Sequence, residues 1–220
     1  MNKKYVYKPY NELFSKLFLE EKRRLLNILK EKCFDIEHIG STAISGLGGK
    51  GVIDIGITVA KENFDDSFDK IESLGYIFRE NGSSPERWFF RIDLPDPQEG
   101  TRRYHLHLTF PESIEWKKLI AFRDYLRWHP SVLEEYAELK RKSAEEVNEN
   151  GALYRKKKSP FFEKVLYKAM KHKIYFVIGA SGSGKTTTLK RFEGAIPSNC
   201  TLLHFLKYTE DYAFSSYPPL

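Results

Sequence analysis

Residues 38–57 read HIGSTAISGLGGKGVIDIGI, and this stretch contains the features from which we infer the fold. A loop of small residues, 40–50, follows a short predicted strand at 35–39. Residues 52–59 are rich in β-branched side chains and read as a buried strand with one charge, Asp54. Small residues after a strand let phosphate groups approach backbone N–H groups closely. The stretch therefore predicts a strand–loop–strand unit with a phosphate-binding loop.

Asp54 is the candidate catalytic residue of this unit. A lone carboxylate in an apolar strand is costly unless it has a partner. A Mg²⁺ ion is one candidate partner, because hard cations that bridge carboxylate and phosphate prefer oxygen ligands. Alternatively, Gly40 and Ser41 merely begin a turn, and Asp54 pairs with a buried arginine or with Lys50. Spacing alone leaves both interpretations open.

Strands dominate the early part of the chain and helices the later part, which is typical of an α+β domain. Helical spacing of apolar residues and capping residues predict helices at 11–32, 63–74, 113–130, 132–150 and 160–172. Further strands are predicted at 76–80, 88–94 and 104–110, the last two as an antiparallel hairpin across a turn-rich segment.

The pattern changes near residue 172, and we place a domain boundary there, between residues 1–172 and 173–220. Residues 179–186 read GASGSGKT and match the P-loop motif GxxxxGK[ST] in full. A predicted strand precedes the motif and a predicted helix follows it, as a P-loop requires. Only 34 residues follow Thr186. We therefore expect a truncated α/β segment, the start of a P-loop kinase-like domain whose missing remainder is a partner.

This loop is expected to bind ATP or another nucleotide. Its glycines let consecutive backbone N–H groups surround the β-phosphate, its lysine contacts the β/γ oxygens, and its threonine hydroxyl coordinates Mg²⁺. The residues concerned are Gly179, Gly182, Gly184, Lys185 and Thr186. Because the other strands and the second acidic residue of a complete kinase are missing, we expect weak phosphate binding and no transfer.

The 220 residues are 41% hydrophobic and 30% charged, with a mean hydropathy of −0.51, which favours a globular chain. No apolar stretch reaches the roughly 18 residues of a membrane span, and no apolar segment of signal-peptide length follows the N-terminus. We therefore expect a cytoplasmic protein without a membrane partner. Cys33 and Cys200 lie far apart and form neither a disulfide framework nor a metal cluster.

The formal net charge of +6 comes mainly from one short segment. Residues 1–150 carry 24 Lys and Arg against 26 Asp and Glu, whereas residues 151–173 carry eight against one. The run RKKK at 155–158 could attract nucleic acid or anionic lipid. We favour a solvated helix start and linker, because nucleic-acid binders usually extend a basic face over more of the fold. Nucleic acid is therefore not an expected partner.

Several separated motifs resemble the GrpB-like family. They are HIGSTAISGLGGK at 38–50 running into VID at 52–54, RYHLHL at 103–108, AFRDYLRWHP at 121–130, and a later helix with Tyr136, Leu139 and Lys140. They occur in order over about residues 5–172. The resemblance implies a nucleotidyltransferase-like fold, a mixed sheet with flanking helices. Members of the family are described as accessory domains, sometimes fused to dephospho-CoA kinase, with no firm reaction attached to them.

Motif spacing and the resemblance together predict one pocket lined by Gly40, Ser41 and Asp54, with Lys50 at its rim. The chain departs from the nucleotidyltransferase pattern, because Gly56 stands where a second acid is expected. A two-metal displacement needs several carboxylates, whereas one acid can hold one Mg²⁺ together with water and a substrate phosphate. Transfer chemistry is therefore in doubt.

Histidines could complete the site. His105 and His107 alternate along a strand and so point to one face, where they could join Asp54 as a metal-binding set. Either could lie at the rim of the pocket, His38 could add to the set, and Asp93 or His107 could meet the third acidic position. Hydrogen-bonded structural histidines are the alternative.

Two arginines, Arg123 and Arg127, lie one helical turn apart and could clamp phosphates. Pairing with acids such as Asp124 and Glu115 on the surface is the alternative.

Three functions remain open from the sequence. The first is a binding module for a nucleotide or a phosphorylated small molecule, an accessory domain attached to the P-loop segment. The second is an active Mg²⁺-dependent nucleotidyltransferase that uses Asp54. The third is a noncatalytic scaffold. The missing second acid favours the first function, and whether the chain is an enzyme stays open.

Overall fold

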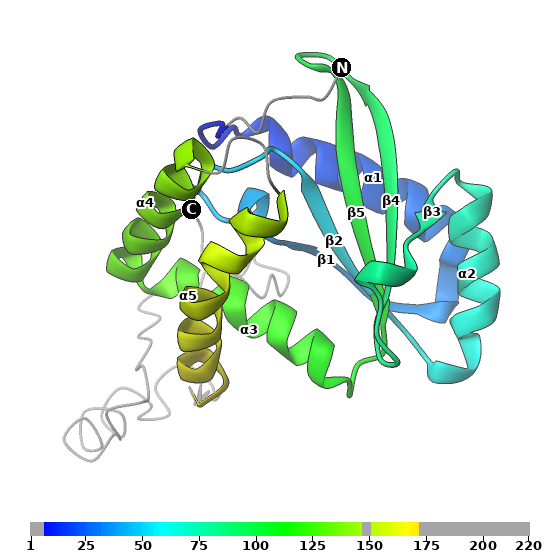
Figure 1. The fold of residues 1–220 in the computed structure, drawn as a ribbon. Coiled ribbons are helices and arrows are strands. Elements are labelled where there is room, and N and C mark those ends of the chain that lie inside the picture. Colours follow the sequence, from blue (N-terminus) through cyan, green and yellow to red (C-terminus); the bar gives the residue numbers. More distant parts are fainter. Residues whose placement is uncertain (1–6, 147–150, 172–220) are drawn as a thin grey trace, which may run out of the picture. The chain divides into compact units, whose positions relative to one another are not determined.

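A five-stranded mixed sheet forms the centre of the computed structural model, which describes residues 7–146 and 151–171 (Figure 1). Its strands are β1 (Cys33–Ile39), β2 (Ile53–Val59), β3 (Ile77–Phe78), β4 (Trp88–Asp96) and β5 (Gly100–Thr109), in the order β1-β2-β5-β4-β3. β2 and β5 are parallel, and the other neighbours are antiparallel. The predicted α+β class is confirmed. The second predicted domain, 173–220, lies outside the described residues.

Five helices flank the sheet: α1 (Leu13–Leu29), α2 (Phe64–Ser73), α3 (Ile114–Trp128), α4 (Pro130–Glu146) and α5 (Gly151–Lys171). The first four agree with the predicted helices to within a few residues at either end. Among the described residues, no helix combines the length and the apolar character needed to cross a membrane.

The fifth helix differs from the prediction, because α5 starts at Gly151 and continues through Pro160. A proline inside a helix removes one backbone hydrogen bond and leaves the carbonyl four residues earlier without its partner. Here both Pro160 and Lys156 are exposed, so water can solvate that carbonyl. The basic run 155–158 therefore lies in the first turns of α5, as expected for a helix start, and does not form a linker.

Residues along β2 and β5 point alternately to a core face and to a site face. Ile55 and Ile57 of β2 and Leu106 and Leu108 of β5 are fully buried in the cluster that also includes residues of α1 and α2. The intervening residues, such as Asp54, occupy the opposite face. The alternation predicted for residues 105–108 is confirmed.

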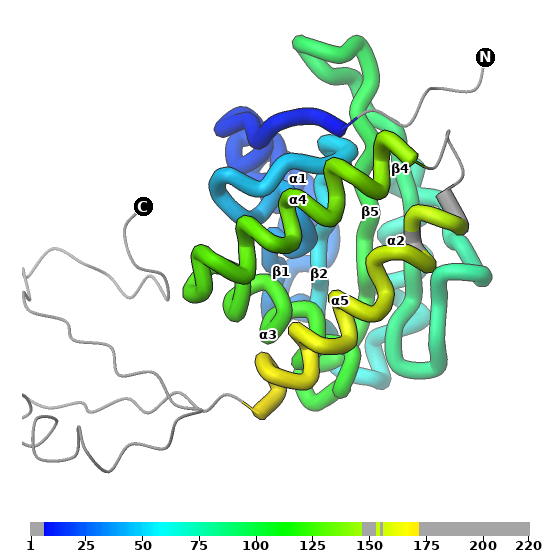
Figure 2. The backbone as a smooth tube through the Cα atoms, turned by 60° about the vertical axis from the view of Figure 1, so that its left-hand side comes forward, coloured from blue at the N-terminus to red at the C-terminus, as the bar shows by residue number. Residues whose placement is uncertain are grey.

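A second apolar cluster joins the small-residue loop to the later helices. Leu47 of the loop packs with Phe122 and Leu126 of α3, Tyr136 of α4 and Val165 of α5. Figure 2 shows these three helices grouped beside β1 and β2. The loop 40–50 is therefore held between the sheet and the helices.

A buried ion pair closes the β4–β5 hairpin. The Arg102 Nε donates to Asp96 Oδ2 at 2.5 Å, and both side chains are almost completely buried. Arg102 Nη1 also donates to the Gly51 carbonyl at 2.8 Å, which ties the hairpin to the chain just before β2.

Replacing this arginine should destabilise the protein strongly. Arg102→Leu leaves the buried Asp96 carboxylate without its partner, so we expect the free energy of unfolding to fall by about 3–5 kcal/mol in urea denaturation. Arg103→Leu is the matched control, because Arg103 pairs with Asp93 at an exposed position and such pairs contribute about 1 kcal/mol or less. Equal losses in the two variants would contradict a special role for the buried pair.

Candidate functional site

The small-residue loop begins in contact with the acidic residue of β2. Gly40 follows β1 and has a φ of +68°, a conformation that favours glycine. A Cβ atom at position 40 would overlap with the Asp54 carboxylate. The antiparallel register of β1 and β2 places Ile39 opposite Asp54. The structure thus brings the predicted site residues Gly40 and Asp54 together.

Asp54 forms a hydrogen-bonded pair with a histidine. The parallel register places Asp54 beside His105, and the distance from Oδ1 to Nδ1 is 3.1 Å. The side chains remain 22% and 28% exposed, respectively. Burial acts to raise the pKa of Asp54, but the hydrogen bond from His105 and the nearby histidines outweigh it and lower this pKa. The partner of Asp54 is therefore a histidine, and the expected pairing with a buried arginine or Lys50 was wrong.

His107 lies on the same face as His105 but has another partner. Its Nδ1 accepts a hydrogen bond from Arg87 Nη1 at 3.3 Å. Burial, followed by the charges of Arg87 and His105, lowers the pKa of His107 to about 3 despite the opposing effect of Asp54. This histidine is therefore neutral.

His38 points to the other face of the sheet. Its ring stacks on Phe18 of α1 with a centroid separation of 4.6 Å. The Thr42 hydroxyl donates to the Val52 carbonyl, so it accepts from His38 Nε2 at 3.0 Å. Burial lowers the pKa of His38 to about 3. His38 is thus a hydrogen-bonded structural histidine.

The acidic residues do not fit a two-metal centre. A Cβ atom at Gly56, the position of the missing second acid, would lie 2.8 Å from Trp116 Cζ3, so α3 fills this space. Asp93 pairs instead with Arg91 and Arg103, at 2.6 and 2.9 Å, which lowers its pKa to about 2.

The predicted set of Asp54, His105 and His107 is likewise not arranged as metal ligands. Within residues 7–146 and 151–171, no group of three or more His, Cys, Asp or Glu side chains could hold a metal ion. We therefore derive no step through a metal. Binding of a single Mg²⁺ by Asp54 and a ligand phosphate stays a prediction.

Ser41 and a buried lysine meet beside the loop. A Cβ atom at Gly49 would lie 2.7 Å from Lys140 Nζ and 2.9 Å from Ser41 Oγ, so both groups approach the bare glycine backbone. Lys140, from α4, is 2% exposed and donates to the Gly48 carbonyl. An ammonium group thus lies beneath the loop that was predicted to bind phosphate.

Two further lysines, Lys158 and Lys50, lie near tyrosine rings and are close enough to Lys140 to affect its pKa. Lys158 Nζ lies 4.4 Å from the ring centroid of Tyr154 and 6.0 Å from that of Tyr136. Lys50 Nζ lies 5.2 Å from Tyr154, and Lys140 Nζ lies 5.5 Å from Tyr136. We call Lys50, Lys158 and Lys140 the lysine row. It joins the loop, α5 and α4.

The charges of the lysine row affect one another. Burial, then Lys158, and to a smaller degree Lys50 lower the pKa of Lys140 to about 7, while the Asp54 carboxylate acts in the opposite direction. Burial also raises the pKa of Tyr136, with a contribution from Asp54. Asp54 is therefore close enough to act on the lysine row electrostatically.

The sequence predicted only Lys50 of this row as a site residue. Tyr136 and Lys140 stand four residues apart in the family motif and so share a helix face, which was a signal for the site. Lys158 was assigned to a solvated segment. Tyr154 gave no signal in the sequence.

The two arginines of α3 donate to backbone carbonyl groups at the end of β1 and at the start of the loop. Arg123 is 2% exposed, pairs with Glu37 at 2.5 Å and with Asp124 at 2.7 Å, and donates to the His38 carbonyl. Arg127 donates to the Ala43 carbonyl at 2.7 Å. The predicted pairing with Asp124 is confirmed for both arginines, at 2.7 Å for Arg123 and 3.5 Å for Arg127. Arg123 forms this pair in a buried position and not on the surface, because its guanidinium is enclosed between α3 and β1.

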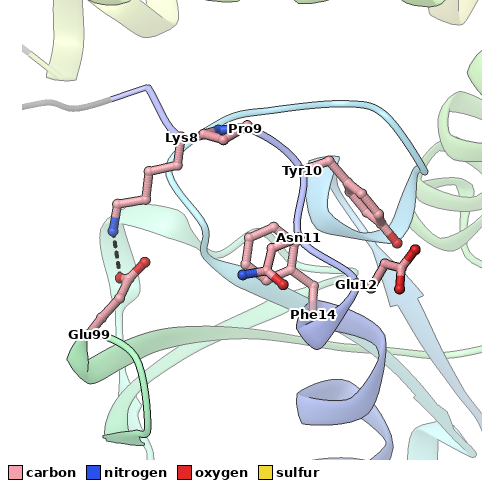
Figure 3. Close-up of a pocket in the computed structure, with 7 residues that line it drawn as sticks. All are labelled: Lys8, Pro9, Tyr10, Asn11, Glu12, Phe14 and Glu99. Carbon is pink, nitrogen blue, oxygen red and sulfur yellow. Dashed lines mark hydrogen bonds and ion pairs between the residues drawn. The ribbon is translucent and has the colours of Figure 1, made fainter.

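A separate hollow of about 500 Å³ lies beside the segment that leads into α1 (Figure 3). Tyr10 and Phe14 are among its lining residues, and the Lys8–Glu99 ion pair, 2.5 Å long, lies at its edge. None of the predicted site residues lines this hollow. The predicted P-loop residues, 179–186, lie outside the described part of the chain.

Fold and site together define an α+β protein in which a glycine–serine loop, a carboxylate–histidine pair and three lysines gather on one face of a mixed sheet. The family model described as GrpB protein matches residues 5–168, and the chain belongs to this family.

Two relatives illustrate how far the similarity extends. UPF0157 protein YqkA of Bacillus subtilis is 35% identical over 139 residues, which cover 61% of this chain and 38% of YqkA. Glutamate-rich protein GrpB of Alkalihalophilus pseudofirmus is 30% identical over 159 residues, 71% of this chain and 91% of that protein. The match thus spans less than half of YqkA.

Solved structures give a similar picture. The crystal structure of conserved protein GrpB from Enterococcus faecalis aligns with a TM-score of 0.66 and 30% identity, over 76% of this chain and 98% of that one. A structure of the GLD-2/RNP-8 complex aligns with a TM-score of 0.48 and 9% identity, over 91% and 74% of the two chains.

The buried lysine should give the protein a characteristic pH dependence. In the folded chain the pKa of Lys140 is about 7, against an ordinary value of 10.5. Between these two values the unfolded chain binds more protons at this residue, so its contribution makes the free energy of unfolding rise with pH. Lys140→Met should remove this contribution. Urea denaturation of both proteins across the pH range checks it, and parallel pH profiles would show that the lysine is not buried as described.

Proposed function

We propose that the face around Gly40, Ser41 and the lysine row binds a phosphorylated ligand, either a nucleotide or a phosphorylated small molecule. The observation that carries this proposal is that the Lys140 ammonium approaches Gly49 together with the Ser41 hydroxyl, while Lys158 and Lys50 are near enough to lower the pKa of Lys140. Lysine side chains and the exposed backbone of a glycine-rich loop are suited to phosphate oxygens.

The energetics of the lysine row support an anionic ligand. Burying the Lys140 ammonium is costly, and the charges of Lys158 and Lys50 add to this cost. A phosphate bound among the three lysines would offset part of the repulsion and favour the charged form of Lys140. Such a ligand would also explain why the ammonium lies beneath an open glycine loop and not in water.

A binding role accounts for the site better than two-metal transfer. The place of the second acid is filled by Trp116, and Asp54 is committed to His105. The second candidate, Mg²⁺-dependent nucleotidyl transfer that uses Asp54 on a nucleotidyltransferase fold, therefore lacks the ligands of a two-metal centre. A noncatalytic scaffold would give no reason to bury the Lys140 ammonium next to two further lysines.

The P-loop motif at 179–186 is a second expected phosphate-binding segment of the chain. If the segment with Lys185 also binds ATP, the first domain acts as an accessory module of a kinase-like segment. Because two phosphate sites would then exist in one chain, binding to the first domain has to be measured separately. The variant Lys185→Ala removes the P-loop cation and leaves the described residues unchanged.

We expect inorganic pyrophosphate to bind to the Lys185→Ala chain through the lysine row. Adding Lys158→Gln should weaken this binding by about 1.5–3 kcal/mol in isothermal titration calorimetry, because a charge-assisted contact to phosphate is lost. Adding Lys164→Gln is the matched control on the same helix, because Lys164 is 58% exposed and pairs with Glu135 at 3.6 Å. The control should bind as the parent chain does.

The alternatives give different results in the same series. Absence of pyrophosphate and ATP binding, with and without Mg²⁺, would favour the scaffold. Release of pyrophosphate from ATP that needs Mg²⁺ and is lost in Asp54→Asn would favour nucleotidyl transfer. Equal binding by the Lys158 and Lys164 variants would remove the lysine row from the site.

A further inference from the structure

The Asp54–His105 pair fixes which nitrogen of the His105 ring is available. The low pKa of Asp54 means that its carboxylate is ionised and only accepts hydrogen bonds. The bond to Asp54 therefore uses the proton on His105 Nδ1. In the neutral ring the lone pair is then on Nε2, at the end of the ring away from the backbone.

The three histidines near Asp54 differ in this respect. His107 Nδ1 accepts from Arg87, so its proton is on Nε2. His38 Nε2 donates to Thr42, and the ring lies almost completely buried beneath Phe18. Of these three, His105 alone combines a carboxylate on Nδ1, an Nε2 lone pair and a partly exposed side chain. For its Nε2 the described part of the chain supplies no hydrogen-bond partner.

The surroundings of His105 keep the ring in place. The ring of Phe89 lies edge-on to it, with centroids 5.0 Å apart. Asp54, which holds the other side, is in turn pressed against Gly40 and acts electrostatically on Lys140. The carboxylate that orients the imidazole is thus close to both the glycine loop and the lysine row.

We propose that His105, oriented by Asp54, is the proton acceptor of the phosphate site, where its Nε2 takes a proton from a water molecule or hydroxyl group that attacks the bound phosphate. The proposal rests on the proposed function, since the lysine row must hold the phosphate. The site would then use acid–base chemistry, whereas the nucleotidyltransferase pattern uses several carboxylates that bind metal ions.

The step balances without a redox partner. As the attacking oxygen forms a bond to phosphorus, its proton passes to His105 Nε2. The bond from phosphorus to the leaving oxygen breaks, and that oxygen keeps the electron pair. The imidazolium, stabilised by Asp54, then returns the proton to the leaving oxygen or to solvent. The substrate class is a phosphate ester or anhydride, with water or a hydroxyl group as the second reactant.

Carboethoxylation by diethyl pyrocarbonate tests the proposal without knowledge of the substrate, because the reagent attacks an unprotonated, accessible imidazole nitrogen. At neutral pH we expect His105 to react faster than His38 and His107, as followed by mass spectrometry of peptides. Inorganic pyrophosphate should protect His105. Asp54→Asn should abolish the fast reaction, because an amide does not enforce a proton on Nδ1.

Asp66→Asn is the matched control, since Asp66 lies on α2 and pairs with Lys32 and Lys70. It should leave the reaction at His105 unchanged. If Asp54→Asn does not fold, nitrogen NMR of the wild-type imidazoles decides the point, and a His105 proton on Nε2 in the neutral ring would overturn the proposal.

The remaining outcomes separate this proposal from the proposed function. Slow modification of His105 in a chain that binds pyrophosphate through the lysine row would overturn the proton acceptor and leave phosphate binding intact. Fast modification that depends on Asp54 but is not affected by bound pyrophosphate would show that His105 does not face the phosphate, which also overturns the proposal. Fast, Asp54-dependent and protected modification supports it.

Discussion

The parallel pairing of β2 with β5 is the constraint on which both the core and the site depend. Because side chains alternate along a strand, one register places Ile55 beside Leu106 in the core and Asp54 beside His105 on the opposite face. A shift of one residue would turn the isoleucines of β2 to the site face and its carboxylate into the core. The apolar core therefore secures the geometry of the Asp54–His105 pair.

Much of this arrangement could be predicted from local sequence patterns. The alternation of apolar and polar residues identified the strands. It also placed His105 and His107 on one face, because side chains two residues apart along a single strand point to the same side. The partner of Asp54 could not be predicted, since it depends on which strand lies beside β2. The Gly56 position was noted as a departure, but the reason that it must stay small, the ring of Trp116, comes from a distant helix.

The lysine row is a clearer example of an arrangement that local sequence patterns do not predict. Lys140 and Lys158 lie on two helices, and only the packing of those helices against the loop brings them together across Tyr136. The run 155–158 was predicted to be solvated from its charge alone. A pattern of charges along a helix does not reveal that Lys158 lies over the rings of Tyr136 and Tyr154. Arg123 illustrates the converse: a residue that looked suited to phosphate is enclosed by carboxylates and a carbonyl group.

The glycine at position 56 and the single carboxylate, Asp54, both depart from the nucleotidyltransferase pattern, and the two departures are physically linked. Filling the second acid position with glycine lets Trp116 approach β2, and this leaves Asp54 as a single carboxylate beside β5. A single carboxylate next to a parallel strand needs a partner, and His105 supplies one by a hydrogen bond without requiring further charges. In the proposed function, the lysines supply the positive charge that a phosphate needs. The proposed site would then divide anion binding and proton transfer between different side chains, whereas a metal centre would combine both in one ion.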